Sequence, residues 1–145
     1  MNHPEQSLQK AVARYLDLVL APEVVWSAVS HGATLGGTKL DRTIRGANLK
    51  RMGQRRGLAD IYIAWKSFRH VPTTMKMEGA SIFADKYDSN TLWLELKSRK
   101  GSQSPEQASF ESRVTAVGHY YFLCRDLGSV MEALEDADVP MRVKR

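Results

Sequence analysis

The chain has 145 residues, of which 43% are hydrophobic and 26% are charged, a size and composition that suit a single globular domain over residues 1–145. A net charge of +5 and a pI of about 9.5 favour a polyanionic partner such as nucleic acid, although a basic surface can also serve solubility alone. The lone Cys124 excludes a disulfide framework and a multi-cysteine zinc site. The lack of a visible signal peptide or a long apolar run predicts a cytoplasmic protein without a membrane partner.

The first half of the chain alternates helical and extended patterns. Apolar residues recur every three or four positions in residues 4–20, which predicts an amphipathic helix. Residues 24–29 are typical of a strand, and residues 38–53 have a helical pattern. The inner positions expected for this second helix are Leu40, Ile44, Ala47 and Leu49. A turn at residues 57–60 is predicted to lead into a second strand over residues 61–65.

The second half begins with residues 66–90, which contain proline, glycine and many polar residues and are interpreted as a long hairpin excursion or insertion. The elements expected after it are a strand at 92–97, a flexible polar loop at 98–103, a helix at about 105–117, a strand at 119–124 and a helix at 129–137. The basic residues 142–145 could form a short edge strand or fray. This order predicts an α/β fold with a small mixed central sheet flanked by helices.

The predicted strand at 92–97 has an unusual composition. Alternate side chains of a strand point to opposite faces, so Leu92, Leu94 and Leu96 would share one face and Trp93, Glu95 and Lys97 the other. Opposite charges are costly to bury unless they are paired or bound to a metal. The strand therefore indicates a functional site, and the alternative is a solvent-facing ion pair on a half-exposed strand.

Three more polar residues fall at positions expected to face inward. Asp60 opens the second strand, Glu5 lies on the inner stripe of the first helix, and Gln107 lies on the inner stripe of a later helix. Each has a structural alternative. Asp60 could cap a turn, Glu5 could favour the positive end of its helix, and Gln107 could form a capping box with Ser104.

Two carboxylates on neighbouring strands, Asp60 and Glu95, could hold a magnesium ion, which prefers hard oxygen ligands. The backbone carbonyl of Leu96 could add a ligand. A metal held in this way can polarise a phosphate oxygen and lower the pKa of a bound water, and an adjacent Lys97 could orient that water. These residues predict a metal-dependent nuclease.

The same residues resemble the PD-(D/E)XK nuclease superfamily, through Asp60 followed by Glu95-Leu96-Lys97. The finer pattern resembles the VRR-NUC family, and the segments that carry it are Glu5–Gln9, Lys50–Gly53, Gly57–Asp60, Glu95–Lys97 and Ser104–Gln107. The likeness runs from about residue 4 to about residue 125. Ala59 stands where the family usually has proline.

The resemblance implies a restriction-endonuclease-like core and a Mg²⁺- or Mn²⁺-dependent phosphodiesterase acting on DNA. Asp60 and Glu95 would be metal ligands, Lys97 the catalytic lysine, Glu5 an outer acidic group and Gln107 a positioning residue. Stand-alone family members of this size are similar to phage or bacterial nucleases that cut branched DNA, including Holliday junctions, as homodimers.

A basic cluster precedes Asp60, with only Asp41 opposing it. Its members are Lys39, Arg42, Arg45, Lys50, Arg51, Arg55 and Arg56. They are candidates for contacts to the DNA backbone, and the alternative is a solvated helix face. Because no helix-turn-helix or zinc finger is apparent, we expect DNA shape to matter more than sequence. The competing functions are a non-catalytic DNA-binding module with a vestigial nuclease fold and a protein-interaction scaffold.

Overall fold

The structure, a computed structural model, describes residues 4–29, 38–51, 57–77 and 80–142, with the backbone alone for residues 45, 68–77 and 80–86. Within these ranges, a four-stranded sheet has the order β1-β2-β3-β4. Its strands are β1 (Val25–Ala28), β2 (Ile61–Met77), β3 (Ala80–Leu96) and β4 (Tyr120–Cys124). Strands β1, β2 and β3 pair antiparallel, and β4 lies parallel to β3. The predicted mixed sheet is therefore confirmed.

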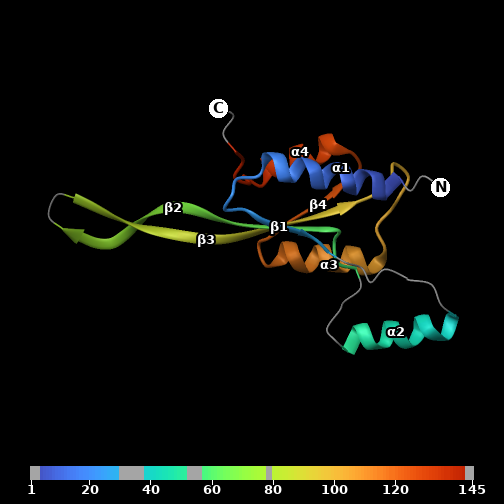
Figure 1. Ribbon diagram of the computed structural model, residues 1–145. Coiled ribbons are helices and arrows are strands. Elements are labelled where there is room, and N and C mark those ends of the chain that lie inside the picture. The colour runs from blue at the N-terminus through green and yellow to red at the C-terminus, as the bar shows by residue number, and fades with distance from the viewer. Residues whose placement is uncertain (1–3, 30–37, 52–56, 78–79, 143–145) are drawn as a thin grey trace.

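Helices cover both faces of this sheet (Figure 1). The helices are α1 (Pro4–Val19), α2 (Lys39–Arg51), α3 (Pro105–Ala116) and α4 (Leu127–Asp136). Helices α1 and α4 lie side by side on one face, and α3 lies on the other. The expected α/β class is confirmed. None of the helices in the described ranges combines the length and the apolar character that crossing a bilayer requires.

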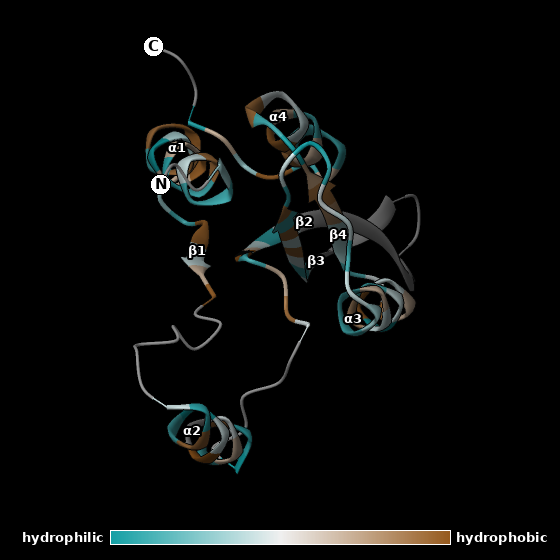
Figure 2. Cartoon of the chain, turned by 90° about the vertical axis from the view of Figure 1, so that its right-hand side faces the viewer, coloured by the Kyte–Doolittle hydropathy of each residue, from teal (hydrophilic) through white to brown (hydrophobic). Residues whose placement is uncertain are grey.

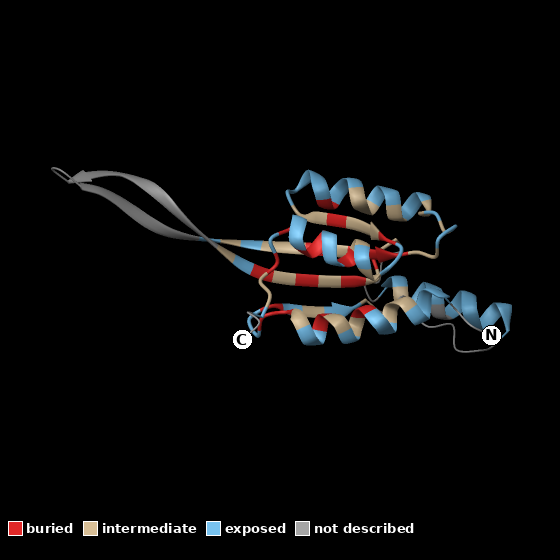
Figure 3. Cartoon of the chain, turned by 90° about the horizontal axis from the view of Figure 1, so that it is seen from above, coloured by how far each residue is buried: buried red, intermediate tan, exposed pale blue. Residues whose placement is uncertain are grey.

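The main hydrophobic core lies between the sheet and helices α1 and α4. Its fully buried side chains include Val12, Leu16, Ile61, Ile63, Leu92, Leu94, Val130 and Leu134. A smaller cluster under α3 contains Ala59, Val114 and Tyr121, with Trp93 and Phe110 packed against it. The alternation predicted for residues 92–97 is thus confirmed: the leucines belong to the main core, and Trp93 packs against the cluster under α3. In Figure 3, buried positions alternate with partly buried ones along the strands of the sheet.

Cys124 lies at the end of β4 and is fully buried in the main core. Burial raises the pKa of its thiol to about 11. The thiol is therefore protonated at neutral pH, which fits a core residue rather than a nucleophile.

The long hairpin excursion predicted for residues 66–90 is confirmed in its described part, where β2 and β3 pair with each other and extend well beyond the predicted strands 61–65 and 92–97. Each has 17 residues, and their distal parts form a two-stranded arm that leaves the body of the molecule (Figure 1). Backbone pairing continues from Ile61↔Leu94 to Met77↔Ala80, with a register shift between Pro72 and Lys76. An isolated ribbon has no face covered by helices, so its sequence need not alternate between apolar and polar residues, and the strand pattern was not visible there.

Helix α2 lies apart from the two helical layers (Figure 2). The prediction that its apolar residues face inward is wrong, because Leu40 and Ile44 are 68% and 52% exposed, and Ala47 is exposed as well. Leu49 is half-buried. The helix begins with local hydrogen bonds, in which the backbone N–H of Thr38 donates to Asp41 Oδ2 at 2.9 Å and the N–H of Asp41 donates to Thr38 Oγ1 at 3.2 Å.

The C-terminal segment returns to the end of α1. Met141 forms an isolated antiparallel bridge with Leu20, and the N–H of Arg142 donates to the carbonyl of Val19 at 2.7 Å. This bridge lies one residue before the segment 142–145, for which an edge strand or fraying was predicted. Arg142 is not part of a strand, and residues 143–145 lie outside the described ranges.

Candidate active site

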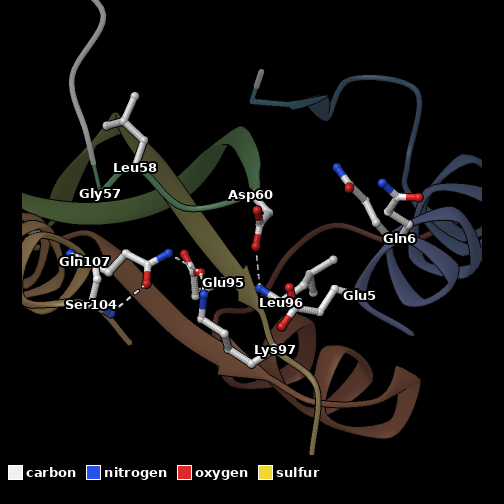
Figure 4. Close-up of a pocket in the computed structure, with 11 residues that line it drawn as sticks. Glu5, Gln6, Gly57, Leu58, Asp60, Glu95, Leu96, Lys97, Ser104 and Gln107 are labelled. Carbon is white, nitrogen blue, oxygen red and sulfur yellow. Dashed lines mark hydrogen bonds and ion pairs between the residues drawn. The ribbon is translucent and has the colours of Figure 1, made fainter. Parts of the chain in front are cut away.

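A pocket opens at the end of the sheet where β3 leads into α3 (Figure 4). The residues that line it are Glu5, Gln6, Gln9, Gly57, Leu58, Asp60, Glu95, Leu96, Lys97, Ser104 and Gln107. Its volume is about 320 Å³, which gives room for an ion, waters and a phosphate group. All the residues predicted as catalytic or metal-binding, from α1, β3, α3 and the segment before β2, lie around this one space.

Glu95 is the one charged residue among those described that is fully buried. Its Oε1 lies 2.7 Å from Lys97 Nζ, and Gln107 Nε2 donates to the same oxygen. The hydroxyl of Tyr121 donates to Oε2 over 3.4 Å. The alternative of a solvent-facing pair is therefore wrong: Glu95 is 0% exposed and the Lys97 side chain 15% exposed. Partners of this kind offset the cost of burying a carboxylate.

Asp60 lies just beyond the last pair of the β2–β3 ladder, Ile61↔Leu94. Its Oδ2 accepts the N–H of Leu96 at 2.7 Å, and its own N–H donates to the carbonyl of Leu94 at 3.0 Å. The Asp60 carboxylate thus accepts a backbone hydrogen bond from β3 just beyond the end of the β2–β3 ladder. Because Glu95 directly precedes Leu96 in the chain, the hydrogen bond from the Leu96 N–H holds Asp60 close to Glu95.

Gly57 brings the segment before Asp60 against the start of α3. Its φ is +81°, and a Cβ at this position would lie 2.5 Å from the backbone carbon and oxygen of Glu106. Only glycine combines that backbone conformation with so close an approach. The sequence predicted a turn at Gly57 but not its contact with α3, which places Asp60 near Gln107.

Gln107 forms the predicted capping box and also contacts Glu95. The N–H of Ser104 donates to Gln107 Oε1 at 2.9 Å, and the N–H of Gln107 donates to Ser104 Oγ at 3.2 Å, so the predicted capping box is confirmed. The amide nitrogen of the same side chain donates to Glu95. Because the cap fixes the amide plane, it also fixes the direction of the hydrogen bond to Glu95.

Glu5 lies in the first turn of α1, where the helix dipole favours an acidic side chain. Its Oε1 accepts the N–H of Ser98 at 3.1 Å. The side chain is exposed, and it ties the start of α1 to the loop that follows Lys97.

A polar group behind Glu95 was missed by sequence reasoning. Gln103 Nε2 donates to Glu111 Oε2 at 2.8 Å and to the hydroxyl of Tyr121 at 3.2 Å. Burial, together with the negative charge of Glu95, raises the pKa of Tyr121. The one signal in the sequence is the position of Tyr121 in its strand, which puts it opposite Trp93 and on the same face as Glu95.

The members of the basic cluster that the structure describes do not line the pocket. Lys39, Arg42, Lys50 and Arg51 lie on α2 with exposed side chains. The side chain of Arg45 and the whole of Arg55 and Arg56 lie outside the described residues. The exposure of α2 fits a surface for phosphate contacts and equally a solvated helix face.

Three carboxylates line the pocket, those of Glu5, Asp60 and Glu95, and the two predicted as metal ligands are Asp60 and Glu95. Across the described ranges, no group of three or more His, Cys, Asp or Glu side chains is arranged to hold a metal. Mg²⁺ is commonly held by only one or two carboxylates, with water and substrate phosphate completing its shell. The oxygen donors of the pocket are therefore of the right kind for Mg²⁺ or Mn²⁺.

Comparison of the sequence with protein-family profiles, with curated proteins and with solved structures gave no match. The likeness to the VRR-NUC family rests on the motif residues alone and stays a prediction. What the chain does is therefore inferred from the chemistry of the pocket.

Proposed function

We propose that the protein is a divalent-metal-dependent DNA endonuclease that hydrolyses phosphodiester bonds. The observation that carries this proposal is the buried Glu95, with Lys97 Nζ at 2.7 Å and Asp60 beside it in an open pocket. A purely structural ion pair needs no access from solvent, whereas the Lys97 side chain of this pair keeps 15% of its surface exposed. This pair forms the wall of a space that a phosphate can enter.

Asp60 and Glu95 would hold the metal through carboxylate oxygens, with the carbonyl of Leu96 as a further donor. A Mg²⁺ or Mn²⁺ ion bound there would polarise a phosphate oxygen and lower the pKa of a bound water. Gln107, fixed by its capping box, keeps the Glu95 carboxylate in one orientation. Such preorganisation places the oxygens before the substrate arrives.

Lys97 would act on the substrate side of the pocket. Its ammonium group can donate hydrogen bonds to the attacking water and to the phosphate oxygen on which negative charge grows. Hydrolysis adds water across the phosphorus–oxygen bond: the water oxygen joins phosphorus, and the leaving oxygen takes a proton. Exposed basic residues of α2, such as Lys39 and Arg42, would hold the DNA backbone outside the pocket.

The proposal extends to branched DNA, such as four-way junctions, and to action as a homodimer. Its support is the resemblance to the VRR-NUC family and the absence of a base-reading motif from the sequence. Sedimentation of the protein with and without a four-way junction tests the homodimer, and competition by linear duplex tests the preference for branches.

Cleavage of supercoiled, linear and four-way-junction DNA with Mg²⁺ or Mn²⁺ tests the activity. We expect Asp60→Asn and Lys97→Met to lower the cleavage rate by a factor of about 100 or more. Lys66→Met, an exposed lysine on β2, is the matched control and should cut normally. Circular dichroism establishes that each variant is folded. Normal cutting by folded Asp60→Asn and Lys97→Met would contradict the proposal.

A non-catalytic DNA-binding module is the second candidate. The observation that favours it is that protein groups already engage the carboxylates, through Leu96 N–H on Asp60 and through Lys97 and Gln107 on Glu95. Calorimetric titration with Mn²⁺ separates the two functions. The nuclease should bind Mn²⁺ at a site that Glu95→Gln weakens, whereas the binding module should show no such site.

A further inference from the structure

The loop between β3 and α3 begins with a tight turn beside the pocket. The N–H of Gly101 donates to the carbonyl of Ser98 at 3.0 Å, which closes the turn over Arg99 and Lys100. Both of these basic side chains are exposed. They lie outside the basic cluster of residues 39–56, and the prediction for this region was only a flexible polar loop.

Arg125, at the end of β4, holds the backbone of this turn. Its Nη1 lies 2.6 Å from the carbonyl oxygen of Ser98, 2.8 Å from that of Gly101 and 3.3 Å from that of Arg99. Hydrogen bonds from a charged donor are stronger than neutral ones. Arg125 therefore holds the backbone of the turn in place, and this backbone carries Arg99 and Lys100.

The turn also abuts the residues of the pocket. A Cβ at Gly101 would lie 3.4 Å from both Glu5 Oε1 and Lys97 Cβ, and the N–H of Ser98 donates to Glu5. The turn that carries the exposed Arg99 and Lys100 therefore lies against two residues of the pocket, Glu5 and Lys97. In Figure 1 the connection between β3 and α3 lies at the same end of the molecule as α2 but apart from that helix.

We propose that Arg99 and Lys100 form a second DNA-backbone site, which binds phosphates that flank the one held in the pocket. This inference rests on the proposed function, since it takes DNA as the substrate. A fixed turn suits phosphates because their spacing along a strand is regular and their recognition needs charge rather than base identity. Two separate basic surfaces, this turn and α2, would then contact the DNA on either side of the reacting phosphate.

Fluorescence anisotropy of a labelled DNA duplex, titrated in EDTA between about 50 and 200 mM salt, tests the inference without any cleavage. Each phosphate contact contributes about 0.9 to the slope of log K against log salt. We expect Lys100→Gln to lower the slope by about 0.9, and the double variant Arg99→Gln/Lys100→Gln to lower it by about 0.9 to 1.8. The matched control is Arg14→Gln/Arg113→Gln, which removes two exposed charges from α1 and α3 away from the pocket.

An equal slope for the double variant and its control, with the wild type binding DNA, would overturn this inference and leave the nuclease proposal standing. No salt-dependent binding by the wild type would overturn both. A slope lowered in the double variant and unchanged in the control supports the site. Because Arg99 and Lys100 are exposed, the variants retain the contacts that hold the turn, and circular dichroism verifies their fold.

Discussion

The end of β3 and helix α2 both carry several charged side chains, but the structure treats them in opposite ways. At the end of β3, Glu95 is fully buried, and its carboxylate forms an ion pair with Lys97 and accepts a hydrogen bond from Gln107. On α2, basic side chains such as Arg42 are exposed, and even Leu40 and Ile44 face solvent. The end of β3 holds individual polar atoms in fixed positions, whereas α2 contributes its total positive charge.

This difference predicts how each region responds to substitution. In a buried set of partners, removal of one group leaves another group unpaired in a place without water. On an exposed helix, water replaces whatever a side chain contributed, and neighbouring charges can substitute for one another. The experiments below measure that contrast.

The largest effect on stability should come from separating the buried pair. Lys97→Met leaves the Glu95 carboxylate buried without its cation, which should lower the free energy of unfolding by about 3–5 kcal/mol. Arg42→Met on α2 should change it by less than about 0.5 kcal/mol. Urea denaturation followed by circular dichroism measures both.

A second substitution separates charge from packing in this pair. Adding Glu95→Gln to Lys97→Met removes the buried charge and should recover part of the lost stability, because a neutral amide costs less to bury than a carboxylate. Equal stabilities for Lys97→Met and Arg42→Met would show that the two regions do not differ in the way their burial suggests.

Much of the site could be predicted because its signals are local. The period-two pattern of residues 92–97 identified the face of Glu95, and the Ser104-Pro105 start of α3 identified the cap at Gln107. Both depend on spacings within a few residues, and burial on one face of a sheet makes that spacing strict.

The errors occur where contacts span the sequence or where no core imposes a pattern. The hydrogen bonds from Arg125 to the turn at Ser98, and from Tyr121 to Glu95, join residues that are 27 and 26 positions apart. No spacing rule indicates such pairs. The apolar residues of α2 were assigned to a core because their period is helical, but period alone does not show whether a partner covers the face.

The next contrast concerns DNA binding by the exposed region. The triple variant Lys39→Gln/Arg42→Gln/Arg51→Gln should lower the slope of log K against log salt by about 0.9 for each phosphate contact, hence by about 2.7 in all. Each single substitution should lower it by a similar share, because exposed charges act almost independently. Anisotropy titrations of a labelled duplex in EDTA measure these slopes.

Stability serves as the control for the α2 variants. The triple variant should unfold at the wild-type urea concentration, since these side chains contact little besides solvent. A wild-type salt slope in the triple variant would assign α2 to the solvated alternative and remove it from the proposed DNA surface.

The smallest expected effect comes from Tyr121, whose hydroxyl donates a hydrogen bond to Glu95 Oε2. Burial raises the pKa of Tyr121 above its ordinary value of about 10, so the folded protein holds this proton more tightly than the unfolded chain does. As the pH rises above about 10, the unfolded chain ionises first, and the free energy of unfolding falls until the pH reaches the folded-state pKa. One such proton accounts for less than about 1.4 kcal/mol per pH unit.

Tyr121→Phe lacks the proton, so it should lose less stability than the wild type between about pH 9 and pH 11. Urea denaturation at each pH measures this loss. Tyr15→Phe on α1 keeps Tyr121 and should follow the wild type. Parallel losses in all three proteins would mean that the hydroxyl behind Glu95 is no more confined than an exposed one.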